Sequence, residues 1–339
     1  FRRVLFRSKG DDQEIKASLG VSAMGSVWDD RDLSAFMGLK QELSLSALIA
    51  SDFSGISIPD LVVTTPEMTL RGNAQLDDAF AVSNAKFVGD VADLSVFSAI
   101  SGLDLSGQGQ VTLGNLSWSE NAGAKGDLAI SASQTGFGIA DLDRIIGPSP
   151  TITGKVALLP NLDLAIDVNA VDTAMVKGPV KVDITDEFER LSVTGNFDVG
   201  SGVVPTDMGV SIAPSTISVI LNGDIAETTG QFDLRVPNLE ASGQNFSNIR
   251  LATRMEWSAQ SVLSLINKAE FDFSGRPYDL RANVGLPSDA LRVDGISLRG
   301  DHLNLTGAVS LADYETPLRG KITLSNLEAE MLEIGRAHV

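Results

Sequence analysis

The sequence predicts an all-β protein: a long, curved, mostly antiparallel sheet with an apolar groove and a few short helices. Three observations predict this fold. Apolar and polar residues alternate along most of the chain, turn-forming residues separate the alternating runs, and a repeated phrase places glycine in step with the apolar positions. A period of two puts the apolar side chains on one face of a sheet and the polar ones on the other. This pattern is typical of antiparallel strands, because parallel strands covered on both faces are apolar throughout.

The amino-acid composition argues against several classes of protein and of functional site. The 339 residues carry a net charge of -18, are 43% hydrophobic and include no cysteine. The hydrophobic content excludes wholesale disorder, and the negative charge argues against a nucleic-acid partner. Without cysteine there is no disulfide framework, no thiolate metal site and no cysteine nucleophile. No uncharged stretch reaches the roughly 20 apolar residues that a membrane-spanning helix needs.

The two ends of the sequence differ from the body between them. Residues 1–8 carry three arginines and no acid, whereas residues 9–332 are acidic. Back-translation of residues 333–339 gives a DNA sequence whose reverse complement, read in a shifted frame, encodes residues 2–8. We therefore expect residues 1–8 and 333–339 to derive from a sequencing adapter, and residues 9–332 to be a fragment of an elongated β domain.

The predicted strands follow one another along the body. The clearest alternating runs cover residues 162–168, 180–184, 232–236, 251–257 and 280–286. Glycine, asparagine, aspartate and proline lie between them, as chains of strands and turns require. The densest group of carboxylates falls between two runs, and we expect a charged hairpin turn there instead of a catalytic pair. These residues are Asp183, Asp186, Glu187 and Glu189.

Three short helices are predicted beside the sheet. Residues 29–38 would begin at a capping Asp29 or Asp30. Residues 93–102 begin with a capping aspartate and end with a glycine, and residues 138–147 have the same outline. Each spans two or three turns at most, so they indicate corner pieces and not a helical layer.

A nine-residue phrase, apolar-x-apolar-x-Gly-x-apolar-x-apolar, recurs at irregular spacing. Glycine inside a strand costs roughly 0.5–1 kcal/mol relative to alanine, so its recurrence calls for a reason. Two compatible interpretations stay open: the glycines let a long sheet curl, or they leave room on the apolar face for a ligand chain. The glycines concerned are Gly72, Gly107, Gly154, Gly195, Gly223 and Gly307.

The sequence contains few of the residues and motifs that a catalytic site needs. His302 is the only histidine of residues 9–332, so the usual nucleophile–base pairs cannot form. Phosphate-binding loops, nucleophile elbows and dinucleotide fingerprints do not occur in the sequence. We therefore expect no enzyme, no cofactor and no metal site. What remains is the apolar face, on which Trp118 and Trp257 are predicted to be buried.

Three segments resemble the TamB family of translocation and assembly module proteins, within the AsmA-like superfamily. Residues 91–109 are similar to the segment in which a short helix precedes a Leu-x-Gly strand, residues 135–156 to the unit that follows it, and residues 296–311 to the repeated strand phrase. The resemblance covers most of residues 60–330. It implies a β-taco-like sheet with an apolar groove, in a periplasmic protein anchored in the inner membrane of a Gram-negative bacterium.

The resemblance also implies a role in outer-membrane biogenesis. Members of the family support protein secretion and autotransporter assembly with an outer-membrane barrel of the Omp85/TamA type, and phospholipid transfer between the two membranes. In this chain, phospholipid acyl chains would lie on the apolar face, where each buried methylene gains roughly 0.8 kcal/mol. The candidate groove residues are Leu103, Leu105, Val111, Leu162, Leu164, Ile166, Phe232, Leu234, Leu303, Leu305 and Val309.

Two other hypotheses stay open. A secreted, adhesin-like array of β-sandwiches would show similar alternation, but it predicts closed domains of about 100 residues with filled cores. An enzyme would need a deep polar pocket in which carboxylates converge.

Overall fold

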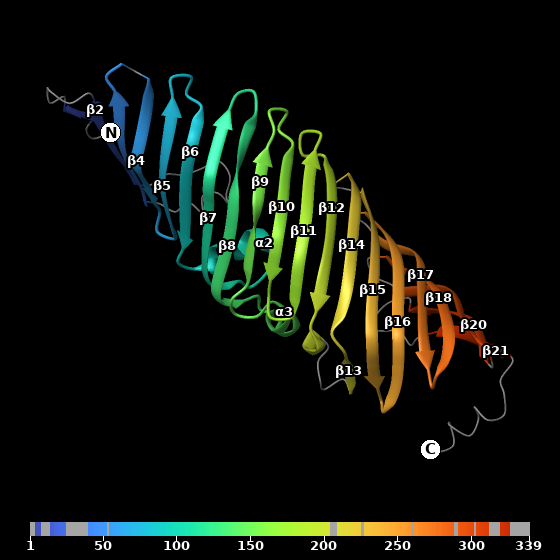
Figure 1. Cartoon of the computed structure of the whole chain (residues 1–339). Helices are drawn as coiled ribbons and strands as arrows, with labels where there is room; N and C mark the ends of the chain where they lie inside the picture. Colours follow the sequence, from blue (N-terminus) through green and yellow to red (C-terminus); the bar gives the residue numbers. More distant parts are fainter. Residues whose placement is uncertain are drawn as a thin grey trace. The chain divides into compact units, whose positions relative to one another are not determined.

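The protein is described by a computed structural model that covers residues 4–7, 14–24, 40–52, 54–203, 209–224, 227–258, 261–287, 291–301, 303–311 and 319–325. The chain divides into two units, Phe1–Val180 and Lys181–Val339. Each unit is built on an open antiparallel sheet in which strands adjacent in sequence lie side by side (Figure 1). The all-β, antiparallel prediction is confirmed. The helix expected at residues 29–38 and His302 lie outside the described residues.

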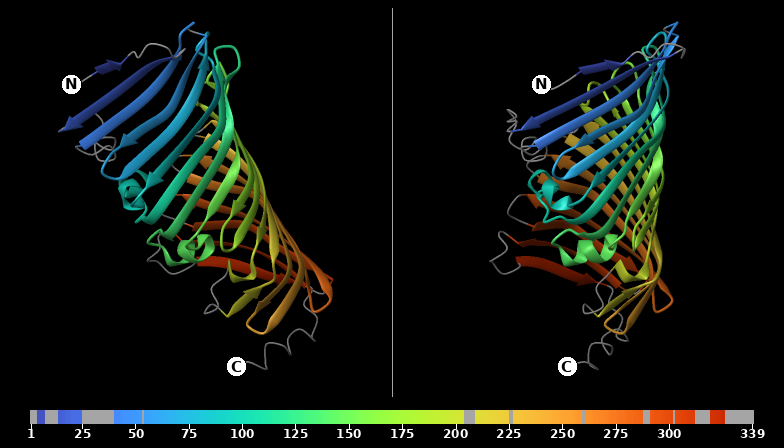
Figure 2. Two further views of the ribbon diagram at one scale, coloured as in Figure 1. Left: turned by 60° about the vertical axis from the view of Figure 1, so that its left-hand side comes forward. Right: turned by 90° about the vertical axis from the view of Figure 1, so that its left-hand side faces the viewer.

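The first unit is a meander in which each strand from β1 to β10 pairs with the next one along the chain. Its strands fan out progressively (Figure 2), as the right-handed twist of β-structure requires. The strands are β1 (Val4–Arg7), β2 (Glu14–Met24), β3 (Lys40–Ala50), β4 (Gly55–Thr64), β5 (Met68–Asp77), β6 (Val82–Val91), β7 (Ser106–Ser119), β8 (Gly123–Gly136), β9 (Thr151–Leu158) and β10 (Leu164–Asp172); β11 (Val176–Thr185) begins in this unit and ends in the next.

The second unit also pairs its strands in sequence order, with one irregularity. The short β13 and the longer β14 follow each other along the same neighbour, β15, and β14 also pairs with β12. From β15 to β21 each strand again pairs with the next. The elements are β12 (Arg190–Val199), η2 (Ser201–Val203), β13 (Val210–Ile212), β14 (Ser215–Asp224), β15 (Glu227–Ala241), β16 (Gln244–Ser258), β17 (Ser261–Phe273), β18 (Arg276–Pro287), β19 (Leu291–Gly300), β20 (Leu303–Leu311) and β21 (Arg319–Ser325).

Two of the three predicted helical segments are confirmed. Residues 93–102 form η1 (Leu94–Phe97) and α2 (Ser98–Ser101), with Asp93 accepting a hydrogen bond from the Ser95 amide and Gly102 closing the C-terminus in the left-handed region. Residues 138–147 contain α3 (Ala140–Ile146). Figure 2 shows α2, between β6 and β7, and α3, between β8 and β9, at the same ends of the strands and on the same side of the first sheet. Both helices are corner pieces at the end of the strands.

The third helix, α3, is fixed to the sheet by main-chain bonds. The amides of Ala174 and Met175, which follow β10, donate to the carbonyls of Ile146 and Ile145 at 2.9 and 3.0 Å. The Thr173 hydroxyl contacts the Ile145 carbonyl at 3.2 Å. The carbonyls in the last turn of α3 therefore accept hydrogen bonds from donors in the strand connection beside it, as the carbonyls of a helix C-terminus require.

Candidate functional site

The apolar face of the first sheet is continuous from strand to strand. Residues directly opposite each other on paired strands point to the same face. Following these pairs across β2 to β10 gives a row with an apolar residue or glycine on each strand. The row consists of Val21, Leu43, Val63, Leu70, Gly89, Val111, Ile130, Ile152 and Val171.

The second sheet carries a row of the same kind. It crosses β12 and β14 to β21 without a polar side chain. A neighbouring row is less uniform, because Thr253 and Asn267 lie between Phe232 and Ala282. The apolar row consists of Phe197, Ile217, Leu234, Leu251, Ala269, Leu280, Leu298, Leu305 and Leu324.

No second sheet covers these faces within either unit, as far as the described residues go. Wherever exposure is described, the members of both rows remain partly exposed, and Val111 is 39% exposed. Only Ala85, Val91, Val168, Val236 and Tyr278 count as buried hydrophobic residues among those described. A β-sandwich would bury the inner faces of two packed sheets. The sandwich array is therefore not the architecture of either unit.

Most predicted groove residues occupy the expected face. Val111 belongs to the row above, Leu164 and Ile166 pair with Leu158 and Val156 on the same face, and Leu103 and Leu105 precede β7 in the chain. In the second unit the following predicted residues lie on the apolar face: Phe232, Leu234, Leu303, Leu305 and Val309. The predicted groove residues that lie in strands therefore fall on the apolar face of their own unit.

Two residues are not where the alternation placed them. Leu162 lies in the turn between β9 and β10, with a φ of 68° and 52% exposure, because its amide closes the turn onto the Leu159 carbonyl at 2.9 Å. Pro160 and Asn161 are the turn signals that the alternation overrode. Trp118, expected to be buried, is 43% exposed. The side chain of Trp257 lies outside the described residues.

The strand glycines mark places of close approach. A Cβ on Gly72 would overlap the ring of Phe87, which lies directly across on β6. Gly107 has a φ of 104°, and a Cβ there would come within 2.6 Å of the Ser133 and Gln134 carbonyl oxygens at a register shift. The backbone of the adjacent strand likewise crowds Gly154, Gly223 and Gly307, while Gly195 is buried opposite Val219. At five of these glycines the protein itself occupies the space, which favours the structural interpretation over ligand room.

An aromatic cluster that was not predicted from the sequence lies on the apolar face of the second sheet. Phe246 stacks on Phe273 with ring centroids 5.0 Å apart, and Phe271 stacks on Tyr278 at 5.6 Å. Both contacts join directly opposite residues, and Tyr278 is only 6% exposed. The alternating Phe-Asp-Phe at residues 271–273 was the available signal. The rings therefore add aromatic contacts between β16, β17 and β18.

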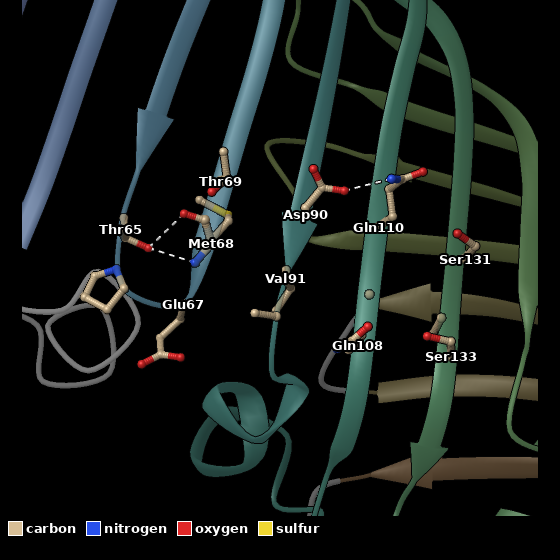
Figure 3. A pocket seen from close by; sticks show the side chains of 14 residues that line it. Thr65, Glu67, Met68, Thr69, Asp90, Val91, Gln108, Gln110, Ser131 and Ser133 are labelled. Atoms are coloured by element: carbon tan, nitrogen blue, oxygen red, sulfur yellow. Dashed lines mark hydrogen bonds between the residues drawn. The ribbon is translucent and has the colours of Figure 1, made fainter.

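The opposite face of each sheet is polar. Beside the apolar row of the first unit runs a row that includes Thr69, Asp90, Gln110 and Ser131. These side chains line a shallow depression of about 480 Å³ near the β4–β5 turn (Figure 3), and Gln110 Nε2 donates to Asp90 Oδ1 at 2.7 Å. Asp90 also accepts from Arg71 at 3.3 Å. The depression is a hydrogen-bonding surface whose lining includes two carboxylates, those of Asp90 and Glu67.

Carboxylates elsewhere serve local structure. Of the four carboxylates predicted to form a turn, Asp186, Glu187 and Glu189 lie exposed in a turn at residues 186–189. Asp183 lies in β11 instead, where it forms an ion pair with Lys181 at 2.9 Å. Hydrogen bonds from the amide and hydroxyl of Ser95 lower the pKa of Asp93 below its ordinary value of 3.8. Within the described ranges, no three histidine, aspartate or glutamate residues gather closely enough to hold a metal ion.

The chain matches no known family model, no curated protein and no solved structure. In the part of the chain that the structure describes, no helix is both long enough and apolar enough to span a membrane.

Proposed function

We propose that the apolar faces of the two units hold phospholipid acyl chains, as segments of a TamB-like protein that supports outer-membrane biogenesis. The observation that carries the proposal is the pair of apolar rows, each crossing nine strands with no sheet packed over it within its unit. Large exposed apolar surfaces of soluble folds mark binding sites more often than accidents.

The dimensions of a row suit an acyl chain. Neighbouring strands lie about 4.8 Å apart, so eight spacings extend over roughly 38 Å of sheet. An acyl chain spans about half of a hydrocarbon core of about 30 Å. Each methylene removed from water gains roughly 0.8 kcal/mol, so a chain laid along the row is held without any specific polar contact.

The polar face gives the same arrangement its solubility. Residues such as Asp90, Gln110 and Ser131 keep one side of the sheet in water while the other side holds the lipid. On the resemblance to TamB, we propose that the protein works in the periplasm of a Gram-negative bacterium, anchored to the inner membrane and together with an Omp85/TamA-type barrel. Protein secretion and phospholipid transfer are the processes proposed for it.

Photo-crosslinking tests the proposal with adjacent positions as matched controls. A photoreactive amino acid replaces Ile166 or Leu305 on the apolar face, and Asp167 or Thr306 on the polar face of the same strands. After incubation with phospholipid vesicles and illumination, we expect lipid adducts at Ile166 and Leu305 only. Adducts confined to Asp167 and Thr306, or equal at all four positions, would reject acyl-chain binding on the apolar face.

A further inference from the structure

An arginine pair lies on the polar face of the second sheet. Arg235 on β15 is directly opposite Arg250 on β16, and both side chains are exposed. Like charges in directly opposite positions destabilise a pair of strands. The Arg235–Arg250 pair therefore does not stabilise the pairing of β15 with β16.

The nearby acids do not neutralise the pair. Asp233 accepts from Gln231 at 2.9 Å, and Asp272 accepts from Asn248 at 2.7 Å. Glu270, the residue across from Arg250 on β17, is paired with Lys268. Within the described ranges, neither Arg235 nor Arg250 has a carboxylate within ion-pair distance. Two guanidinium groups thus face solvent side by side in a chain whose net charge is -18.

The surface around the pair is hollowed. A depression of about 190 Å³ is lined by Arg235, Arg250 and Lys268, together with the carboxylates of Asp233 and Glu270. A second one, of about 240 Å³, lies on the side of Ser215 and Thr216 and is again lined by both arginines. Arg250 and Arg299 also border a third depression, of about 560 Å³, which contains four acids, Glu270, Asp272, Asp279 and Asp301. Of these three depressions, only the one beside Ser215 and Thr216 is lined by both arginines and by no carboxylate, so it is the one suited to a small anion.

We propose that Arg235 and Arg250 form a binding site for a phosphate group. Each guanidinium presents a planar fork of donors that matches a phosphate edge. A carboxylate offers a single two-oxygen edge, whereas a phosphate has further oxygens and can present a separate edge to each fork. The site lies on the face opposite the apolar rows. Phosphate binding is therefore independent of acyl-chain binding, and a negative result for one proposal does not reject the other.

The phosphate can come from a soluble phosphate ester or from a lipid headgroup at a membrane surface, and two probes separate these sources. Calorimetric titration with inorganic pyrophosphate reports the soluble source. Flotation with phosphatidylcholine vesicles, with and without phosphatidylglycerol, reports the membrane source. Both are run on the full chain and on the double variant Arg235→Gln/Arg250→Gln. The control, Lys125→Gln/Lys155→Gln, removes the same charge from exposed positions of the first unit.

We expect the wild-type chain to bind at least one probe, with affinity that falls as salt rises. The arginine variant should lose about tenfold or more in affinity, and the lysine control should keep the wild-type value. Because the substitutions relieve like-charge repulsion, the arginine variant should melt no earlier than wild type without ligand. Absence of wild-type binding to both probes, or an equal loss in the two variants, would overturn the proposal.

Discussion

At the scale of single residues, glycine and aromatic side chains form complementary pairs across strands. Phe87 lies over Gly72, and Tyr278 lies over Gly300, each pair directly opposite on neighbouring strands. The ring covers backbone that glycine leaves bare, which compensates for the weak strand propensity of glycine. These pairs explain two in-strand glycines without any ligand.

The Gly72 pair can be tested with alanine. In Gly72→Ala the new methyl overlaps the Phe87 ring, so the ring or the strand must shift, and we expect a loss of about 1–3 kcal/mol in unfolding free energy. Gly20→Ala is the control, because a Cβ there meets nothing within 4 Å and should gain up to about 1 kcal/mol. Urea unfolding measures both, and a neutral Gly72→Ala would contradict the close-packing account.

Asp93 predicts a pH effect at the start of η1. Hydrogen bonds from Ser95 favour its ionised form and lower its pKa below 3.8. A depressed folded-state pKa means that the cap stabilises the protein above pH 3.8 and loses its contribution as the pH falls through the lower, folded value. In Asp93→Asn the cap does not titrate. The stability advantage of wild type over this variant should therefore shrink in acid, and an NMR-measured Asp93 pKa at or above 3.8 would refute the prediction.

Residue-level errors of the sequence analysis have local causes. Alternation placed Leu162 in a strand because the period of two continues from Leu164 back through it, although the chain turns at Pro160 and Asn161. The strength of an apolar pattern cannot by itself show where a strand begins. Helix caps were easier to predict, since the Asp93 carboxylate accepts the capping hydrogen bond and Gly102, which has no Cβ, adopts the left-handed conformation that ends the helix.

At the scale of elements, the alternation of apolar and polar residues predicts which segments form strands. It does not predict how the residues of one strand align with those of its neighbour. Irregularities at Ser106/Gln108 and Gly114/Ser117 shift β7 against β8, and others interrupt β16, β17 and β19. An extra residue in one strand is invisible in sequence, because it depends on the length of the partner strand. The facing rows could therefore be assembled only from the pairings in the structure.

The apolar row of the second sheet makes a prediction about two adjacent residues of β16. Leu251 lies in the row between Leu234 and Ala269, whereas Ala252 points to the polar face. Leu251→Ser should lower the unfolding free energy by about 2–4 kcal/mol, since it removes apolar contacts and adds a hydroxyl to the apolar face. Ala252→Ser should stay within about 0.5 kcal/mol of wild type. Equal effects in chemical denaturation would mean that the two faces are not different environments.

At the scale of the whole molecule, the sequence predicts the class of the fold because nearly every strand carries its own two-faced pattern. It does not predict the division into two units, which falls inside β11. It also leaves open whether a second sheet covers the apolar face, since Leu234 or Leu280 would read the same in a filled sandwich. Only the arrangement of strands decides that, and within each described unit the face stays uncovered.

The most direct test places single cysteines along the apolar row, in a chain that has no cysteine of its own. Spin labels at Leu234, Leu280 and Leu305 report the apolar face, and labels at Asp233, Arg281 and Thr306 report the polar face of the same strands. On addition of phospholipid, electron paramagnetic resonance should show water accessibility falling at the first three positions and unchanged at the other three. Unchanged accessibility at the apolar positions in the presence of bound lipid would contradict the acyl-binding face.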